Sequence, residues 1–124
     1  MKWLQNPNFS GRVPFLQLHN YTKGRDQQLF AMKVVHYADE KIPVHCHDYY
    51  ELVVIQNGDG YHFLDGKTAR LFHGNVLLIQ PGQVHTYQDF SHLTLLTFMF
   101  HPDMLKNHEN ELRPIDGFQL IFGD

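Results

Sequence analysis

The chain has 124 residues, 43% of them hydrophobic, and a net charge of −3 at pH 7, which together predict one globular domain and exclude a disordered tail. Its lysines and arginines are scattered, so this chain lacks the basic stripe with which DNA-binding domains contact phosphates. The sequence has no membrane-spanning apolar run, no secretory signal and a single cysteine, Cys46, so we expect a cytoplasmic location and no membrane partner.

The expected elements begin with an irregular arm and continue as short strands. Residues 1–28 are polar, with proline and glycine breakers, and should form an N-terminal arm with at most one short strand, around residues 15–18. The folded domain is expected over residues 29–124. Short runs of β-branched and aromatic residues predict eight strands there, at about 29–37, 43–47, 50–56, 60–65, 67–72, 76–80, 84–88 and 92–101.

Turn residues separate these runs. Asn57-Gly58-Asp59-Gly60 and Asp65-Gly66 supply residues that tolerate positive φ in hairpins, and Pro81-Gly82 suits the centre of a type II turn. One short helix near the C-terminus is expected, over residues 103–110. Many short strands with almost no helix predict an all-β sandwich or closed barrel. Because the strongly apolar residues 118–122 come just before the end of the sequence, we expect the chain to be part of a longer protein.

Two histidines and a glutamate lie close together in the sequence. Side chains two apart on a strand share a face, so His45 and His47 point the same way. Along a straight strand the α-carbons of His47 and Glu51 would lie about 13 Å apart, at ~3.3 Å per residue, so Glu51 joins the histidines only if the chain bends or bulges. His85 follows the Pro81-Gly82 turn, where a neighbouring strand could place it alongside. Imidazoles and carboxylates are ligands of divalent transition metals.

The spacing of these residues follows a known motif. The first motif of the cupin family, H-x-H-x3-E-x6-G, is matched at every named position, by His45, His47, Glu51 and Gly58. The resemblance implies an all-β cupin fold, which is a double-stranded β-helix or jelly-roll barrel with one metal site inside. It also implies the ligands of one divalent transition metal, such as zinc, nickel, manganese or iron: His45, His47, Glu51 and His85.

The second cupin motif, G-x5-P-x-G-x2-H-x3-N, is matched in part. Gly74, Gly82 and His85 stand at its glycine and histidine positions. Gln80 replaces the proline, with Pro81 one residue late, and Asp89 replaces the asparagine. Both departures are at positions that do not bind the metal, so they put the shape of the turn in doubt rather than the ligand set.

About a third of the chain also resembles a more specific family. The N-terminal domain of AraC-family transcription regulators is similar to the run HCHDYYELVVIQNGDGYHFLDGKTARLFHGNVLLIQPGQVHTY. The resemblance implies an arm before the barrel, a sugar or similar small effector inside it, and a homodimer. Members of this family continue into two helix-turn-helix motifs, and nothing in this chain resembles them. DNA would therefore be bound only through a missing C-terminal domain.

The effector is expected to lie inside the barrel, near the four candidate ligands. Aromatic side chains on neighbouring strands could add faces on which a sugar stacks, although core packing accounts for such residues as well. No residue is assigned a catalytic role. The expected effector-binding residues are His45, His47, Glu51, Tyr61, Phe63, His85 and Tyr87.

Two other functions compete with the sensing domain of a regulator. Three histidines and one glutamate around an open metal support Lewis-acid or oxygen chemistry, so a free-standing metal-dependent cupin enzyme, such as an isomerase or dioxygenase, fits the same ligand set. A small binding or storage cupin without catalysis is the third possibility. Alternatively, the four candidate ligands line a polar pocket that binds no metal.

Overall fold

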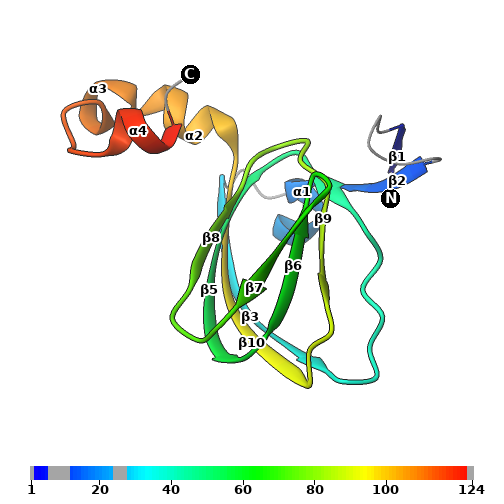
Figure 1. Ribbon diagram of the computed structural model, residues 1–124. Helices are drawn as coiled ribbons and strands as arrows, with labels where there is room; N and C mark the ends of the chain where they lie inside the picture. The colour runs from blue at the N-terminus through cyan, green and yellow to red at the C-terminus, as the bar shows by residue number, and fades with distance from the viewer. Residues whose placement is uncertain (1, 6–11, 24–27, 123–124) are drawn as a thin grey trace.

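Two antiparallel sheets face each other and form a barrel (Figure 1). This computed structural model describes residues 2–5, 12–23 and 28–122. One sheet has the order β3-β10-β5-β8, with bounds Leu29–Tyr37, His92–Phe100, Tyr50–Gly58 and Val76–Ile79. The other has the order β7-β6-β9, with bounds Lys67–Leu71, Gly60–Leu64 and His85–Gln88. Buried apolar side chains of both sheets pack into one core, which includes Val53, Leu71, Ile79 and Leu93.

Seven of the eight predicted strands lie within two residues of these bounds. The eighth, predicted over residues 43–47, is much shorter, because β4 contains only Cys46–His47. Pro43 has no N–H to donate to a neighbouring strand, which opposes regular pairing at this position. His45 still forms a single bridge with His85 on β9, so the short segment stays next to the barrel wall.

Alternation along β3 separates an outer from an inner face. Leu29, Val35 and Tyr37 are exposed on one side of the strand. Met32 and Val34 belong to the other side and line the interior of the barrel. Because β3 is an edge strand paired only with β10 in its sheet, its inner face forms one wall of an internal space.

The N-terminal arm contains more regular structure than expected. It forms β1 (Lys2–Gln5), β2 (Arg12–Leu16) and α1 (Leu18–Thr22) where at most one strand was predicted. β2 pairs in parallel with β4, so tertiary contact gives this polar segment the partner that its own sequence pattern does not reveal. Residues 1, 6–11 and 24–27 of the predicted arm lie outside the described residues.

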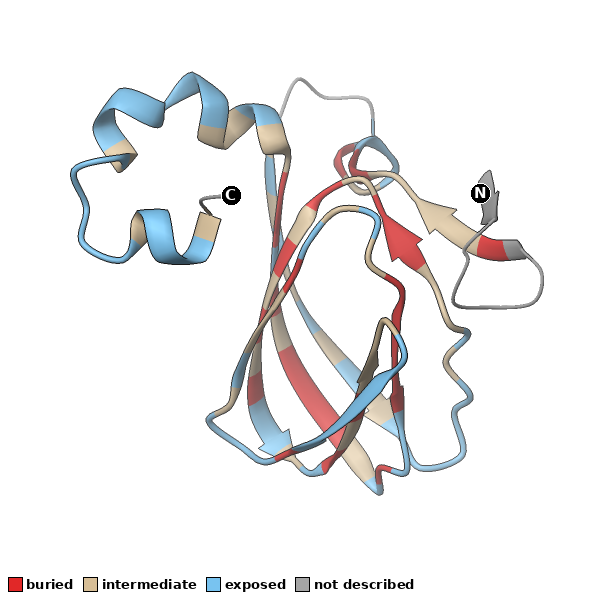
Figure 2. Cartoon of the chain, turned by 45° about the horizontal axis from the view of Figure 1, so that its top comes forward, coloured by how far each residue is buried: buried red, intermediate tan, exposed pale blue. Residues whose placement is uncertain are grey.

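Three short helices follow β10, where one was predicted. They are α2 (Pro102–Asn107), α3 (Glu109–Leu112) and α4 (Phe118–Phe122). The predicted helix is interrupted at His108, whose φ of −114° and ψ of 19° are not helical. Figure 2 shows these helices largely exposed and to one side of the barrel. Within residues 2–5, 12–23 and 28–122, no helix has the length and apolarity needed to cross a membrane.

Gly58→Ala is expected to destabilise the barrel much more than Gly66→Ala. Both glycines have positive φ, +93° and +88°, so alanine strains either backbone by about 1 kcal/mol. A Cβ at Gly58 would lie 2.0 Å from the carbonyl oxygen of His92, whereas nothing lies within 4 Å of one at Gly66. Urea unfolding should show a loss of about 1 kcal/mol for Gly66→Ala and more than about 3 kcal/mol for Gly58→Ala. Equal losses would contradict this close approach.

Candidate functional site

A bend after β4 brings Glu51 next to a histidine. β4 ends at His47, and the chain bends at Asp48 before β5 begins. The arm holds this bend, because the N–H of Asp48 donates to the carbonyl of Leu16 (3.1 Å) and the N–H of Leu18 donates to Asp48 Oδ1 (2.9 Å). Glu51 Oε2 consequently lies 3.4 Å from His47 Nε2. The bend that this contact required is therefore present.

A tight turn places His85 beside the same histidine. The ends of turn 80–83 are joined by a 3.1 Å backbone hydrogen bond, and Gly82 has φ +83°, as a type II turn requires. The N–H of Gly82 donates to the carbonyl of His47 (2.9 Å), which ties the turn to β4. His45 and His85 then exchange two backbone hydrogen bonds of 2.9 and 3.0 Å. These bonds bring two segments that are 40 residues apart to one wall of the barrel.

The two departures from the second cupin motif are accommodated locally. The N–H of Gln80 donates to the side chain of Gln83 at 2.8 Å, which closes the turn without the expected proline. Asp89 has φ +51°, a left-handed conformation that aspartate and asparagine tolerate better than most residues. Neither change displaces His85 from the site.

Three of the four predicted metal ligands lie together. One ligand atom each from His47, Glu51 and His85 lies within 4.8 Å of the other two, and all three residues are buried. His45 does not belong to this compact group. Its ring is half-buried beside the group, 4.4 Å from the ring of His85 between centroids.

The histidine rings are oriented through their Nδ1 atoms. Nδ1 of His47 donates to the carbonyl of Tyr49 (2.7 Å), and Nδ1 of His45 donates to the carbonyl of Pro43 (2.8 Å). Since a carbonyl only accepts, the proton of each neutral ring is on Nδ1 and the lone pair is on Nε2. This is the tautomer that binds a metal through Nε2.

The donor set fits a divalent transition metal. Nε2 of His47 and Nε2 of His85 are buried and have no hydrogen-bond partner within the described part of the chain. Burying polar nitrogens without a partner is unfavourable, and an ion next to Glu51 would relieve that cost. Two imidazoles and one carboxylate are donors that zinc, nickel, manganese and iron(II) accept.

Burial sets the protonation of the site. It lowers the pKa of His47 to about 3 and that of His85 well below its usual range, because a buried imidazolium loses its hydration. It raises the pKa of Glu51 to about 7 for the same reason, since burial disfavours the charged form. Near neutral pH the imidazoles of His47 and His85 are therefore neutral, and their lone pairs are free to bind a metal. Glu51 is present in both its protonated and its ionised form at this pH.

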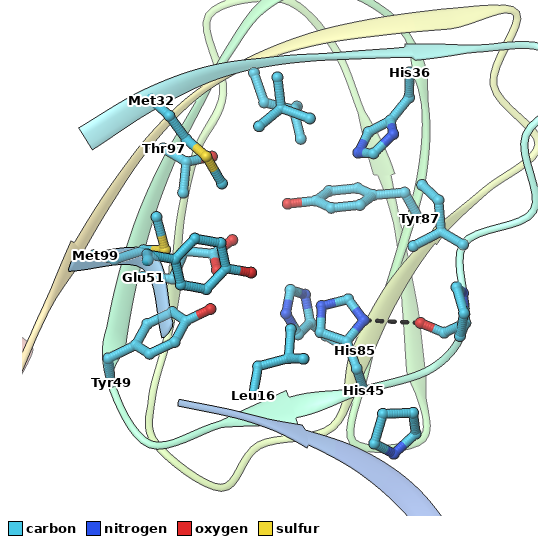
Figure 3. A pocket seen from close by; sticks show the side chains of 16 residues that line it. Leu16, Met32, His36, His45, Tyr49, Glu51, His85, Tyr87, Thr97 and Met99 are labelled. Carbon is cyan, nitrogen blue, oxygen red and sulfur yellow. Dashed lines mark hydrogen bonds between the residues drawn. The ribbon is translucent and has the colours of Figure 1, made fainter. Parts of the chain in front are cut away.

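A cavity of about 320 Å³ opens beside this group. Glu51, His85 and Tyr87 line it together with His45, whereas His47 is fully buried and lies outside its lining. Figure 3 shows Met32, Thr97 and Met99 on one wall and the hydroxyl of Tyr87 directed into the interior. The volume is at the small end of the range for ligand pockets, so the cavity can hold one small molecule.

Besides His47, two more of the expected effector contacts, Tyr61 and Phe63, do not line the cavity. Tyr61 and Phe63 are partly exposed and lie on the outer face of β6, and Tyr61 contacts Arg70 with its ring. The expectation that Tyr61 and Phe63 contact an effector in this cavity is therefore not met. The physical reason is that strand alternation fixes which residues share a face but not which face is inside, and the aromatic residues were assigned to the interior.

The inner face of β6 carries His62, which sequence reasoning did not select. His62 is buried, lies opposite Tyr87 in the strand register, and its Nε2 is 3.1 Å from Nδ1 of His85. It therefore orients the ring of His85 as the carbonyls orient the other two histidines. The sequence offers one signal for it. His62 is two residues after Gly60, so the two share a face of β6, and Gly60 is buried.

Tyr87→Phe is expected to maintain or raise the stability of the ligand-free protein, by up to about 1 kcal/mol. The hydroxyl of Tyr87 is buried without a hydrogen-bond partner in the described residues, so its removal relieves a desolvation cost. Thr86→Val is the matched control, because the Thr86 hydroxyl donates to the carbonyl of Ile42 at 2.8 Å and its loss should cost about 1 kcal/mol. Thermal unfolding distinguishes the two, and equal losses would show that Tyr87 is satisfied in the free protein.

Comparison with known sequences decides the family. Residues 29–121 match the family described as the AraC-like ligand binding domain. The chain belongs to this family. Similar proteins include the HTH-type transcriptional activator RhaR of Shigella dysenteriae serotype 1, with 30% identity over 98 residues, and that of Salmonella arizonae, with 29% over 94 residues. These matches cover 79% and 76% of this chain but 34% and 33% of the activators, so the chain spans about a third of their length.

Solved structures confirm the fold. A cupin protein from Bacteroides fragilis has a TM-score of 0.56 and 22% identity, over 68% of this chain and 74% of its own. A Cupin 2 conserved barrel domain protein from Salinispora arenicola has a TM-score of 0.56 and 16% identity, over 70% and 75%. The DMSP lyase DddQ of Ruegeria pomeroyi reaches 0.56 as well, over 60% of this chain and 39% of its own. The all-β cupin fold predicted from the two motifs is therefore correct.

Proposed function

We propose that this domain senses a small effector for an AraC-type, DNA-binding transcription regulator. The family match and the names of the related activators support this role. The observation that carries it is a cavity next to buried polar atoms, Tyr87 hydroxyl and His85 Nε2, that have no partner within the described residues. In the metal-free domain an effector in the cavity would supply those partners, and it would be released chemically unchanged.

The proposal includes one divalent transition metal, zinc, nickel, manganese or iron(II). His47, Glu51 and His85 would hold it, with His45 next to them. The support is the tautomer of His47 and the two unpartnered Nε2 atoms. Such an ion would supply positive charge and an open coordination position to an oxygen of the effector.

Residues 1–28 and 29–124 are the arm and the sensing domain of this proposal. Pro14, Leu16 and Tyr21 of the arm line the cavity. An effector therefore touches the arm as well as the barrel, and its binding favours the arm conformation that makes those contacts. A ligand shifts a conformational equilibrium only through such differential affinity.

The partners of the domain are also part of the proposal. The regulator would be a cytoplasmic homodimer that binds DNA through a helix-turn-helix domain outside this chain. Leu120 and Ile121 of α4 are exposed and provide apolar surface for a second copy. Sedimentation equilibrium tests the dimer. Nanomolar, sequence-selective DNA binding by this chain at physiological salt would contradict the proposal that DNA is bound only by a domain outside it.

A ligand screen that also measures consumption tests the sensing role. A ligand at a hundred times its dissociation constant should stabilise the domain by about 2.7 kcal/mol, which is several degrees in melting temperature. NMR of the same mixtures should show the ligand unchanged after hours. Turnover at enzyme-like rates would instead support the metal-dependent cupin enzyme, an isomerase or dioxygenase.

The chemical class of the effector is a separate question from the sensing role. A sugar is the expectation that the family resemblance supplies, and no related protein or solved structure named above identifies the effector of this chain. The side chains around the cavity bear on this choice directly, and they favour a less hydroxylated molecule.

A further inference from the structure

We propose that the effector is a small amphiphile, with one apolar ring or short branched chain and a single oxygen-bearing head group, rather than a polyhydroxylated sugar. This inference rests on the proposed sensing function and concerns the same cavity. It follows from three features of the lining: a large aliphatic surface, two buried polar atoms without partners, and the absence of lysine and arginine among the described lining residues.

A large part of the cavity wall is aliphatic. β3 contributes Met32 and Val34, β10 contributes Leu95 and Met99, and the loop before β4 contributes Ile42. Their side chains offer no hydrogen bonds to a ligand. Methionine side chains are also polarisable and adapt their shape to apolar groups. These walls therefore fit a hydrocarbon body.

A sugar fits these walls poorly. It carries hydroxyl groups around its whole ring, and each of them needs a partner once it is removed from water. Hydroxyls that faced Met32, Val34 or Leu95 would be buried without one. Among the described residues that line the cavity, Glu51 is the single carboxylate, and asparagine, glutamine and aspartate do not occur.

The head group has a defined place. Glu51, His85 and Tyr87 all line the cavity, and the hydroxyl of Tyr87 points into it (Figure 3). The Tyr87 hydroxyl and His85 Nε2 are buried without partners in the described part of the chain. In the metal-free domain, one oxygen-bearing group of a ligand would satisfy both.

The charge of the head group depends on the metal. No lysine or arginine occurs among the described lining residues, so nothing in the metal-free cavity balances a carboxylate. A neutral head, such as an alcohol, should therefore bind the metal-free domain better than an acid of the same shape. A bound divalent ion would reverse this order by supplying the missing positive charge.

Calorimetric titration of matched probes tests the proposal. Cyclohexylmethanol and cyclohexanecarboxylate share one apolar ring and differ in the head group, and D-glucose, D-xylose and L-rhamnose serve as sugars of similar size. Each is titrated into the chain after chelation and after loading with Zn²⁺. We expect at least one cyclohexyl probe to bind at least tenfold more tightly than every sugar, and the carboxylate to gain more than tenfold from Zn²⁺.

Two valine variants locate the contact with the ring. Val34→Thr places a hydroxyl on the aliphatic wall at almost unchanged volume and should weaken the cyclohexyl probes about fivefold or more. Val76→Thr is the matched control, because Val76 is 59% exposed on β8 and outside the cavity lining, and it should leave binding unchanged. Tyr87→Phe should weaken the probes through loss of the head-group contact.

The outcomes separate this inference from the function on which it rests. A sugar that binds as tightly as the cyclohexyl probes, or more tightly, and is weakened by Tyr87→Phe overturns the amphiphile but leaves a sensing cavity in place. Failure of all five probes to bind, with and without Zn²⁺, overturns both.

Discussion

Adding one equivalent of Zn²⁺ or Ni²⁺ to the metal-free domain is expected to raise its melting temperature by about 10 °C or more. A ligand at a thousand times its dissociation constant stabilises the folded state by about 4.1 kcal/mol. For a domain of this size each kcal/mol corresponds to roughly 3 to 6 °C. The binding group is His47, Glu51 and His85, whose ligand atoms lie within 4.8 Å of one another before any ion is added. Differential scanning calorimetry with and without metal measures the shift.

Matched variants show which residues bind the metal. Glu51→Gln and His85→Gln each remove one ligand while keeping side chains of similar size, so each should abolish most of the shift. His73→Gln is the control, because His73 is exposed on the loop between β7 and β8 and should leave the shift intact. His45→Gln should reduce it less than His85→Gln, since His45 lies outside the compact group. If elemental analysis finds no metal, and zinc, nickel, manganese and iron(II) do not shift the melting temperature, the group is a polar pocket that binds no metal.

The metal-free domain is expected to lose stability steeply on acidification, by about 2 to 3 kcal/mol per pH unit between pH 6 and pH 5. His47, His62 and His85 have pKa values lowered by burial, to about 3, to about 4 and well below 6.5. In this window the unfolded chain protonates all three, because its histidines titrate near 6.5, and the folded protein does not. Unfolding therefore takes up three protons at these residues, and His45, whose pKa burial also lowers, adds to this uptake.

Glu51 partly offsets this uptake. Its pKa is raised to about 7 in the folded protein and returns to 4.5 on unfolding, so unfolding releases one proton between these values. The net uptake of about two protons, at 1.36 kcal/mol per proton and pH unit, gives the expected slope. The contribution of the histidines is fully present above pH 6.5 and is lost as the pH falls toward their folded-state pKa values.

Urea unfolding at a series of pH values, with chelator present, measures this slope. His62→Phe removes one of the buried imidazoles and should lower the slope by about 1.4 kcal/mol per pH unit. His73→Phe removes an exposed histidine and should leave the slope unchanged. A wild-type slope near zero would mean that the site histidines are charged in the folded protein, and the tautomers inferred from their Nδ1 bonds would then be wrong.

Local sequence patterns were sufficient to predict most of the barrel. Short β-branched runs predicted the strands, and Gly58, Gly66 and Gly82 marked their ends. These glycines have the positive φ that their turns require. The spacing of His47 and Glu51 implied a bend, and the chain bends at Asp48. These features depend on neighbours in the sequence, which is why the sequence alone reveals them.

Features that depend on distant contacts could not be predicted in this way. β2 of the arm pairs with β1 and also with the distant β4, and no pattern within residues 1–28 indicates the pairing with β4. Strand alternation did not reveal that His62 faces inward while Tyr61 faces outward, since the usual preference for apolar residues inside is reversed at this polar site. His45 lies beside the group of His47, Glu51 and His85 and not within it, although its place in the motif implied that it would be a ligand.

Methionine-methyl NMR is the most direct test of the central claim that an effector binds inside the barrel. Met32 and Met99 line the cavity, whereas Met104 lies on α2 outside its lining, so the chain carries two reporters and an internal control. A ligand that stabilises the domain should shift the methyl resonances of Met32 and Met99 and leave that of Met104 in place. Stabilisation with the Met32 and Met99 resonances unchanged would place the ligand elsewhere and contradict the account.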